Sequence, residues 1–261
     1  MTIIVFDSGI GGLSVMREAR VLMPGHRFVY VGDDEAFPYG DWEEKALADR
    51  MSLVFDQLIE TYDPALIIVA CNTASTVILP HLRARYDIPV VGTVPAIKPA
   101  AELTRSGQVS VLATPGTVQR DYTRNLISEF ASQVNVRLVG AENLAAQAEQ
   151  FMTTGEVDDE VVFGDIEECF VDRLGARTDI VVLGCTHYPF LTNVFRRLAP
   201  WPVDWLNPAE SIARHAKTLI PQVAIQDEVE DIAIFTGGEP AVPLKRLLSG
   251  FGMTARHWRV A

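Results

Sequence analysis

Two of the three cysteines in the chain stand at the same point of two similar segments. Cys71 lies in "LIIVACNTAST" (66–76) and Cys185 in "IVVLGCTHYPFL" (180–191), and each ends an apolar run and begins a polar tripeptide. We expect each cysteine to precede a helix, whose N-terminus would favour the thiolate. A thiol, whose unperturbed pKa is about 8.5, can be held protonated or ionised by modest local changes. Inverting a stereocentre beside a carboxylate needs a base on one face and an acid on the other, and two like groups can exchange these roles. The pair therefore favours racemisation or epimerisation.

The sequence leaves other uses of these cysteines open. A zinc site would need closer ligand spacing, and C-x-H is not a standard pair, so we expect no metal. A redox disulfide would show a C-x-x-C motif or a nearby partner. A nucleophile formed by Cys185 and His187 would leave Cys71 without a role. The third cysteine, Cys169, lies in a predicted helix, "DIEECFVDRL", and is predicted to be a buried structural residue.

A glycine-rich turn, "DSGIGGLS" (7–14), follows the first apolar run. Such a turn can bind a phosphate or carboxylate through backbone N–H groups. It is not the dinucleotide fingerprint, because the G-x-G-x-x-G spacing fails at Ser14. Asp7 is either a cap for the next helix or a partner for a substrate ammonium group.

No cofactor motif is present, and we expect no cofactor. None of the lysines stands at the end of a predicted strand that carries polar residues, which disfavours a pyridoxal phosphate Schiff base there. The lysines are Lys45, Lys98, Lys217 and Lys245.

Short apolar runs alternate with longer amphipathic segments, which predicts an α/β fold. The runs are continuous rather than alternating, as in parallel sheets that are covered on both faces. We predict strands at 2–6, 27–32, 65–70, 88–92, 108–113, 136–140, 179–184 and 231–237, and helices at 12–23, 44–62 and 118–132.

The pattern also repeats, which predicts two pseudo-symmetric α/β domains with central, mostly parallel sheets. "IIVFDSGIGG" is answered by "VSVLATPGT", and "IIVACNTAS" by "VVLGCTHYP". We predict a first domain of 1–95 plus 208–261 and a second of 96–207, with 93–107 carrying the crossing. Ligands of open parallel sheets bind beyond the carboxyl ends of the strands. The active site is therefore expected in the cleft between the domains.

Composition narrows the class of protein. The chain has 261 residues, is 48% hydrophobic and 21% charged, and carries a formal charge of −12, which disfavours nucleic acid and anionic membranes as partners. Three cysteines fit reduced thiols in a cytosolic protein. Neither a signal peptide nor an apolar run of about 20 residues is present, so we predict a cytoplasmic protein.

The motifs together resemble the cofactor-independent glutamate racemase family. They are "VFDSGIGGLSV", "FPYG", "VACNTAST", "PVVGTVPAIKPAA", "VLATPGTVQRDYT" and "VVLGCTHYPFL", and they cover nearly the whole chain. The resemblance implies interconversion of L- and D-glutamate by two thiols, supplying D-glutamate for bacterial peptidoglycan and so for cell wall biogenesis and cell shape. Another acidic amino acid, such as aspartate, is the alternative substrate.

The resemblance also implies roles for individual residues. Cys71 would act with Asp7, and Cys185 with His187, as the catalytic groups. Glu149 falls where the family often has an acid near His187, and Thr114 or Thr117 would add hydroxyl contacts. The implied substrate-binding residues are Asp7, Ser8, Tyr39, Gly40, Asn72, Thr73, Thr186 and His187.

Departures from the family pattern occur in "GDDEAFPYG" (32–40), "DWEE" (41–44) and "WLNPAES" (205–211), and they bear on gating and activation. "VPAIKPAA" and "GTVQRDYT" resemble a Gram-negative subgroup, some members of which are activated by UDP-N-acetylmuramoyl-L-alanine. A monomer or a homodimer fits the family. A third hypothesis is a binding protein that acts on a partner such as DNA gyrase, although the catalytic set is retained.

Overall fold

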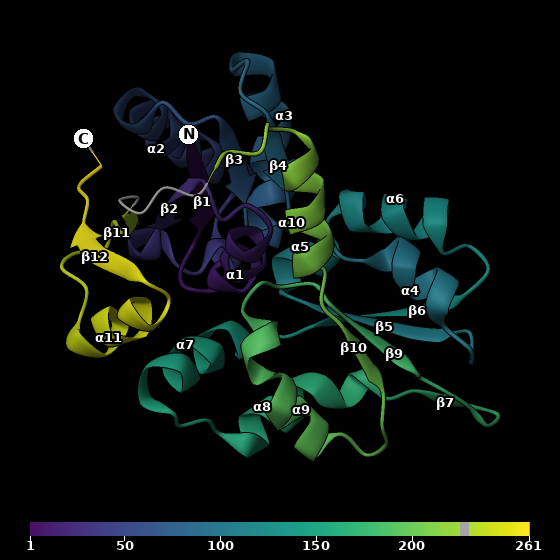
Figure 1. Ribbon diagram of the computed structural model, residues 1–261. Helices are drawn as coiled ribbons and strands as arrows, with labels where there is room; N and C mark the ends of the chain where they lie inside the picture. The colour runs from purple at the N-terminus through teal and green to yellow at the C-terminus, as the bar shows by residue number, and fades with distance from the viewer. Residues whose placement is uncertain (225–229, 261) are drawn as a thin grey trace. The chain divides into compact units, whose positions relative to one another are not determined.

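The computed structural model describes residues 1–224 and 230–260. It divides into two compact units (Figure 1), which we call the first unit (Met1–Thr93 with Ala209–Ala261) and the second unit (Val94–Pro208). Each is built on a parallel sheet, as the α/β prediction requires.

The first unit contains a six-stranded sheet in the order β12-β11-β2-β1-β3-β4, with all pairings parallel. Its strands are β1 (Thr2–Asp7), β2 (Arg27–Gly32), β3 (Leu66–Val69), β4 (Val90–Gly92), β11 (Asp231–Phe235) and β12 (Met253–His257). β11 pairs with β2, so the end of the chain joins the sheet that its beginning forms.

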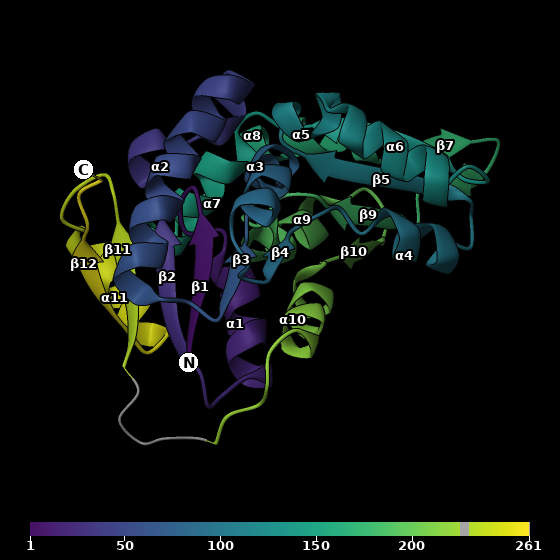
Figure 2. The same cartoon turned by 90° about the horizontal axis from the view of Figure 1, so that it is seen from above.

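Helices cover both faces of this sheet because its strands are apolar on both sides. α2 (Glu44–Tyr62) and α3 (Asn72–Arg85) pack on the face that carries Ile4 and Phe6. α1 (Leu13–Leu22) and α10 (Ala209–Thr218) pack against each other (Figure 2), and α11 (Val242–Gly250) leads into β12. Two short 3-10 helices, η1 (Asp34–Ala36) and η2 (Tyr39–Asp41), follow β2.

The strand order creates a switch point between β1 and β3. From β1 the chain moves to β2 on one side, and then crosses through α2 to β3 on the other side of β1. The turns that follow β1 and β3 therefore diverge, and a crevice at the carboxyl ends of such strands is where open α/β sheets bind ligands.

The second unit repeats this topology with a four-stranded sheet in the order β10-β9-β5-β6, again all parallel. β5 and β9 take the places that β1 and β3 have in the first unit, so its switch point lies between them. Its strands are β5 (Gln108–Ala113), β6 (Asn135–Gly140), β9 (Ile180–Leu183) and β10 (Asp204–Leu206).

One face of this second sheet packs against three helices and the other face mainly against two, in two apolar clusters. The first face is covered by α7 (Leu144–Thr154), α8 (Asp159–Ile166) and α9 (Thr192–Leu198). The second is covered by α4 (Ile97–Leu103) and α6 (Asp121–Phe130), while α5 (Pro115–Gln119) follows β5 directly.

The predicted elements are largely confirmed, and the exceptions have local causes. All eight predicted strands are present, but the predicted helix 118–132 is two helices, because Arg120 between α5 and α6 has extended backbone angles. The predicted helix around Cys169 is wrong. α8 ends at Ile166, and the 3-10 helix η3 (Glu167–Cys169) leads into a hairpin, β7 (Asp172–Arg173) and β8 (Ala176–Arg177). β10 and β12 were not predicted, because their short runs carry charged residues.

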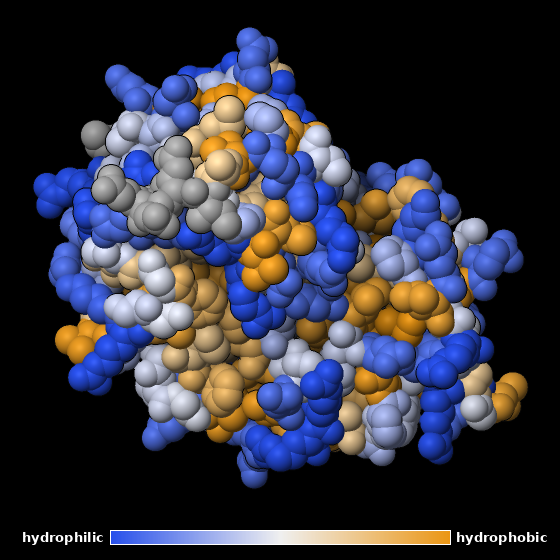
Figure 3. Space-filling view, in the orientation of Figure 1, coloured by the Kyte–Doolittle hydropathy of each residue, from blue (hydrophilic) through white to orange (hydrophobic). Residues whose placement is uncertain are grey.

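The face of the molecule shown in Figure 3 carries hydrophilic side chains interspersed with smaller hydrophobic areas. Among the described residues, no helix is long and apolar enough to cross a membrane.

His26, just before β2, gives a pH-dependent contribution to stability. Its ring is fully buried, Nε2 lies 3.1 Å from the carbonyl oxygen of Pro221, and Nδ1 has no hydrogen-bond partner among the described residues. Burial lowers the pKa of His26 below its usual value of 6.5. The unfolded chain therefore takes up this proton at a higher pH than the folded chain, and acid favours unfolding.

We expect His26→Gln to make the free energy of unfolding fall less steeply between about pH 7 and pH 5, because the variant removes this proton uptake. Urea unfolding at a series of pH values measures the slope. His81→Gln, at an exposed position in α3, is the control and should leave the slope unchanged. Equal slopes for wild type and His26→Gln would contradict the prediction.

Candidate active site

Asp7 ends β1 at the switch point of the first unit. Its side chain is fully buried, and Oδ2 accepts a hydrogen bond from the backbone N–H of Gly12 at 2.8 Å. A Cβ at Gly12 would lie 2.8 Å from the Cβ of Asp7, so the turn needs glycine there. Tyr30 donates from its hydroxyl to the carbonyl oxygen of Gly9 at 2.6 Å. The glycine-rich turn is therefore anchored at two points beside the carboxylate.

Cys71 follows β3 on the other side of this switch point. It occupies the N-cap position of α3 with extended backbone angles, and it is 6% exposed. The prediction that a helix begins directly after Cys71 is therefore confirmed. A helix N-terminus favours a thiolate. Ser8 Oγ lies 3.9 Å from the Cys71 sulfur, so the turn after β1 reaches the thiol after β3.

Asn72 and Thr73 form the first turn of α3 and are almost completely buried. Neither polar atom of the Asn72 amide has a hydrogen-bond partner in the described part of the chain. Buried amides are nearly always hydrogen-bonded in folded proteins. An unsatisfied amide beside a thiol is therefore suited to binding a polar ligand.

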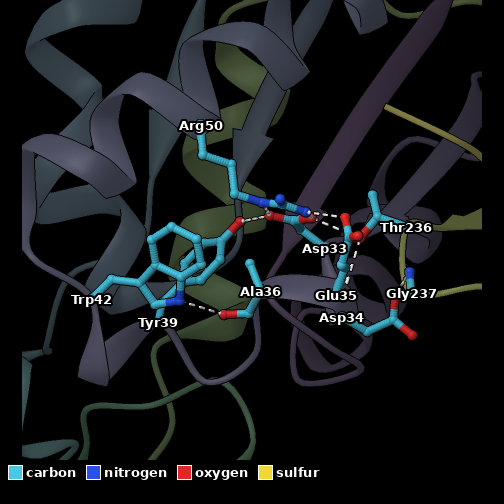
Figure 4. A network of polar contacts seen from close by, with 9 residues as sticks. All are labelled: Asp33, Asp34, Glu35, Ala36, Tyr39, Trp42, Arg50, Thr236 and Gly237. Atoms are coloured by element: carbon cyan, nitrogen blue, oxygen red, sulfur yellow. Dashed lines mark hydrogen bonds and ion pairs between the residues drawn. The ribbon is translucent and has the colours of Figure 1, made fainter. Parts of the chain in front are cut away.

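Tyr39 and Gly40 lie in η2, which packs against α3. Tyr39 is 2% exposed, and its hydroxyl donates to Oδ2 of Asp33 at 2.5 Å (Figure 4). Burial, followed by the charge of Asp33, raises the pKa of Tyr39 well above its usual value, so the hydroxyl stays protonated. A Cβ at Gly40 would meet nothing within 4 Å, which leaves the backbone of this turn open.

Cys185 follows β9 at the switch point of the second unit and is 7% exposed. Its sulfur lies 3.8 Å from Nδ1 of His187, and Nε2 of His187 lies 2.8 Å from Oε1 of Glu149 on α7. The expectation that Glu149 lies near His187 is confirmed. Thiol, imidazole and carboxylate therefore form a continuous series, in which the carboxylate can stabilise an imidazolium.

The helix expected after Cys185 is a short 3-10 helix and not, as after Cys71, an α-helix that starts at the next residue. Cys185, Thr186 and His187 lead instead into a 3-10 helix, η4 (Tyr188–Leu191), and α9 begins only at Thr192. The first turn of η4 contains Pro189, which lacks an N–H. Cys185 has a histidine where Cys71 has a helix N-terminus.

The remaining predicted site residues lie at the carboxyl ends of β9 and β5 in the second unit. Thr186 is 5% exposed next to Cys185. Thr114 is the N-cap of α5 at the end of β5, and its hydroxyl lies 3.0 Å from that of Thr117.

Cys169 has a different environment. It is fully buried in the core beneath α8, and burial raises the pKa of its thiol well above the usual value. A buried thiol of this kind is unreactive.

Sequence reasoning missed Asp33 and Arg50, which hold Tyr39. Asp33 is fully buried and lies directly after β2, one position beyond the residue that pairs with Asp7. Its place after a strand was the one available signal, and Arg50 in the middle of α2 gave none.

The described residues form no metal site at these strand ends, and a large cavity of the second unit lies elsewhere. Within residues 1–224 and 230–260, no group of three or more His, Cys, Asp or Glu side chains is arranged to hold a metal ion. A cavity of about 490 Å³ in the second unit is lined by the first residues of β5 and β6, at the ends of the strands opposite to the switch point.

Comparison with known proteins identifies relatives of the whole chain. The family model for Asp/Glu/Hydantoin racemase matches residues 14–216. The glutamate racemase of Agrobacterium fabrum is 60% identical over 255 residues, covering 97% of this chain and 93% of that protein. That of Sinorhizobium fredii is 60% identical over 257 residues, covering 97% and 96%.

Solved structures that resemble this chain are also glutamate racemases. Escherichia coli glutamate racemase in complex with L-glutamate and the activator UDP-MurNAc-ala superimposes with a TM-score of 0.91 at 38% identity, over 100% of this chain and 98% of that one. Glutamate racemase from Aquifex pyrophilus matches with a TM-score of 0.75 at 27% identity, over 100% and 98%. The predicted fold class is thereby confirmed.

Proposed function

The chain belongs to the Asp/Glu/Hydantoin racemase family and is an isomerase that racemises glutamate, and we propose that Cys71 and Cys185 carry the proton transfers. The observation that supports these roles is the repeated position of the two thiols. Each is a buried cysteine two positions after the last residue of the strand that borders the switch point of its unit.

In one turnover, the thiolate of one cysteine removes the α-proton of glutamate and becomes a thiol. The thiol of the other cysteine gives its proton to the opposite face of the α-carbon and becomes a thiolate. Only protons move, and the charge on the two sulfurs is exchanged at the end. The mechanism requires both sulfurs to reach the same α-carbon from opposite faces.

The two halves assist their thiols differently. At Cys185, the imidazole of His187 takes up the thiol proton, and Glu149 at 2.8 Å stabilises the resulting imidazolium. At Cys71, the N-terminus of α3 favours the thiolate. Asp7 acts with Cys71 and binds the substrate ammonium group.

Polar residues at the strand ends bind the rest of glutamate. The unsatisfied amide of Asn72 supports a contact with a carboxylate, as do the backbone N–H groups of the first turn of α3. Without a cofactor as electron sink, these donors must stabilise the carbanion. The remaining binding residues in this proposal are Ser8, Tyr39, Gly40, Thr73, Thr186 and His187, with Thr114 or Thr117 adding hydroxyl contacts.

The activator of the E. coli protein suggests a ligand for this chain as well. On the basis of the 38% identity, we propose UDP-N-acetylmuramoyl-L-alanine as an activator, with the chain acting as a monomer or homodimer in the cytoplasm. The D-glutamate would enter peptidoglycan synthesis. Neither nucleic acid nor membrane forms part of this proposal.

The purified protein, incubated with L-glutamate in D₂O without added cofactor, should form D-glutamate labelled at the α-carbon until the two enantiomers are equal. Chiral chromatography with mass spectrometry measures both products, with and without the activator. Aspartate is one methylene shorter, so we expect its kcat/KM to be about 10- to 200-fold lower. The absence of D-glutamate under both conditions would refute the function, and faster turnover of aspartate would favour the alternative substrate.

A further inference from the structure

Asp33 is the centre of a buried hydrogen-bond network in the first unit (Figure 4). Its two carboxylate oxygens accept four hydrogen bonds. The donors are the Tyr39 hydroxyl at 2.5 Å, Thr236 Oγ1 at 2.7 Å, and Arg50 Nε at 2.8 Å and Nη2 at 2.5 Å. Asp33 itself is fully buried. The arrangement satisfies a carboxylate that burial would otherwise destabilise strongly.

The donors come from three separate parts of the unit, so Asp33 joins them. Tyr39 belongs to η2, Arg50 to α2, and Thr236 follows β11. Arg50 binds Asp33 through Nε and Nη2, the two donors along one edge of its guanidinium, a geometry that fixes orientation as well as charge. The Arg50 guanidinium also lies 5.9 Å from the centre of the Trp42 ring, and its side chain is only 20% exposed.

The network extends to both residues of the Cys71 half of the proposed site. The backbone N–H of Asp33 donates to the carbonyl oxygen of Asp7 at 2.9 Å. Tyr39 belongs to the same buried cluster as Cys71, and the Cys71 charge contributes, after burial and Asp33, to the raised pKa of Tyr39. The hydroxyl of Tyr39 gives its one proton to Asp33. Tyr39 is therefore held, within the buried cluster that contains Cys71, by its bond to Asp33.

We propose that Asp33 and Arg50 are positioning residues for the Cys71 half of the site, because together they fix Tyr39, which packs in the same buried cluster as Cys71. This inference rests on the proposed function. Neither residue touches the reacting atoms. Their effect is on geometry, since a displacement of about 1 Å near a reacting group can lower the rate about 100-fold.

Deuterium isotope effects at the α-position distinguish a positioning role at Cys71 from a loss of structure that affects both cysteines. L- and D-glutamate have equal free energies, so kcat/KM in the two directions must fall equally in any variant. A variant that slows proton transfer at Cys71 alone raises the α-deuterium isotope effect on kcat/KM more for the enantiomer that Cys71 deprotonates. Asp7→Asn is the reference for this pattern, a larger isotope effect for the enantiomer that Cys71 deprotonates. Glu149→Gln, which acts at the Cys185 half, should show a larger isotope effect for the other enantiomer.

We expect Asp33→Asn to lower kcat about 10- to 100-fold with little change in KM, and to show the asymmetry of Asp7→Asn. Arg50→Gln should behave alike, and Arg50→Lys should retain more activity because it keeps the charge. Glu35→Gln is the matched control. Glu35 bonds Arg50 at 2.9 Å from the solvent side and is 58% exposed, so its loss should change kcat less than about twofold.

Tyr39→Phe decides the question if Asp33→Asn does not fold. It keeps the ring and removes the bond to Asp33, so it should show the same asymmetry of isotope effects. Where Asp33→Asn does fold, the effects of the two substitutions on kcat should not add in the double variant. Equal isotope effects in both directions, or the asymmetry of Glu149→Gln, would overturn the inference while leaving the function intact. An inactive wild-type protein would refute the proposed function, and this inference with it.

Discussion

Cys71→Ser and Cys185→Ser should each lower racemase activity by at least about 10³-fold, because a serine hydroxyl cannot take up or release the proton at neutral pH. Racemisation needs one thiol on each side of the α-carbon, so the loss of either should be nearly complete. The assay is formation of D-glutamate from L-glutamate, with circular dichroism to verify folding. A variant that keeps more than a tenth of the activity would refute the role of that cysteine.

The two variants should differ in their residual chemistry. Each keeps one working thiol, so any remaining exchange of the α-proton with D₂O should affect one enantiomer, and the two variants should select opposite enantiomers. Exchange of the same enantiomer by both would contradict a two-sided mechanism.

Cys169→Ser is the matched control for this pair. Cys169 shares an apolar cluster with Cys185 but is fully buried in η3 and does not follow a strand at a switch point, so activity should persist. The buried hydroxyl should lower the free energy of unfolding by about 1–3 kcal/mol. If this variant alone were inactive, the assignment of the thiols would be wrong.

Phe6→Ala should lower the free energy of unfolding by about 3–5 kcal/mol, the largest effect on stability that we expect. Phe6 is fully buried directly before Asp7, and its ring centre lies 4.8 Å from that of Phe55 and 6.4 Å from that of Tyr39. Alanine leaves a cavity between β1 and α2 that rigid neighbours fill only in part. Urea unfolding followed by circular dichroism measures the change.

Leu53→Ala is the control for packing. Leu53 lies in α2 like Phe55 but is 47% exposed, so its truncation should cost less than about 1 kcal/mol. A comparable loss for the two variants would show that Phe6 does not contribute as a core residue.

Much of the fold could be predicted because its signals are local. Continuous apolar runs identified eight strands, and the polar residues after them identified the edge at which Cys71 and Asp7 lie. The motifs also identified the family, which the comparisons confirm. Prediction failed around Cys169, where a helical pattern gives way to a hairpin, because Gly175 and Leu174 take up left-handed backbone angles. A positive φ at leucine is rare, and sequence spacing does not indicate it.

The sequence by itself determined the α/β class, the repeated position of the two thiols and the family, because apolar runs, turns and motifs are written in neighbouring residues. The tertiary structure decided which distant groups meet. Thr236 bonds Asp33 across 203 positions, and Glu149 meets His187 across 38. Such contacts follow from the order of strands in a sheet, which brings together ends that the chain separates. The position of Tyr39 in the Cys71 cluster is therefore a property of the folded unit, held by residues that no local motif marks.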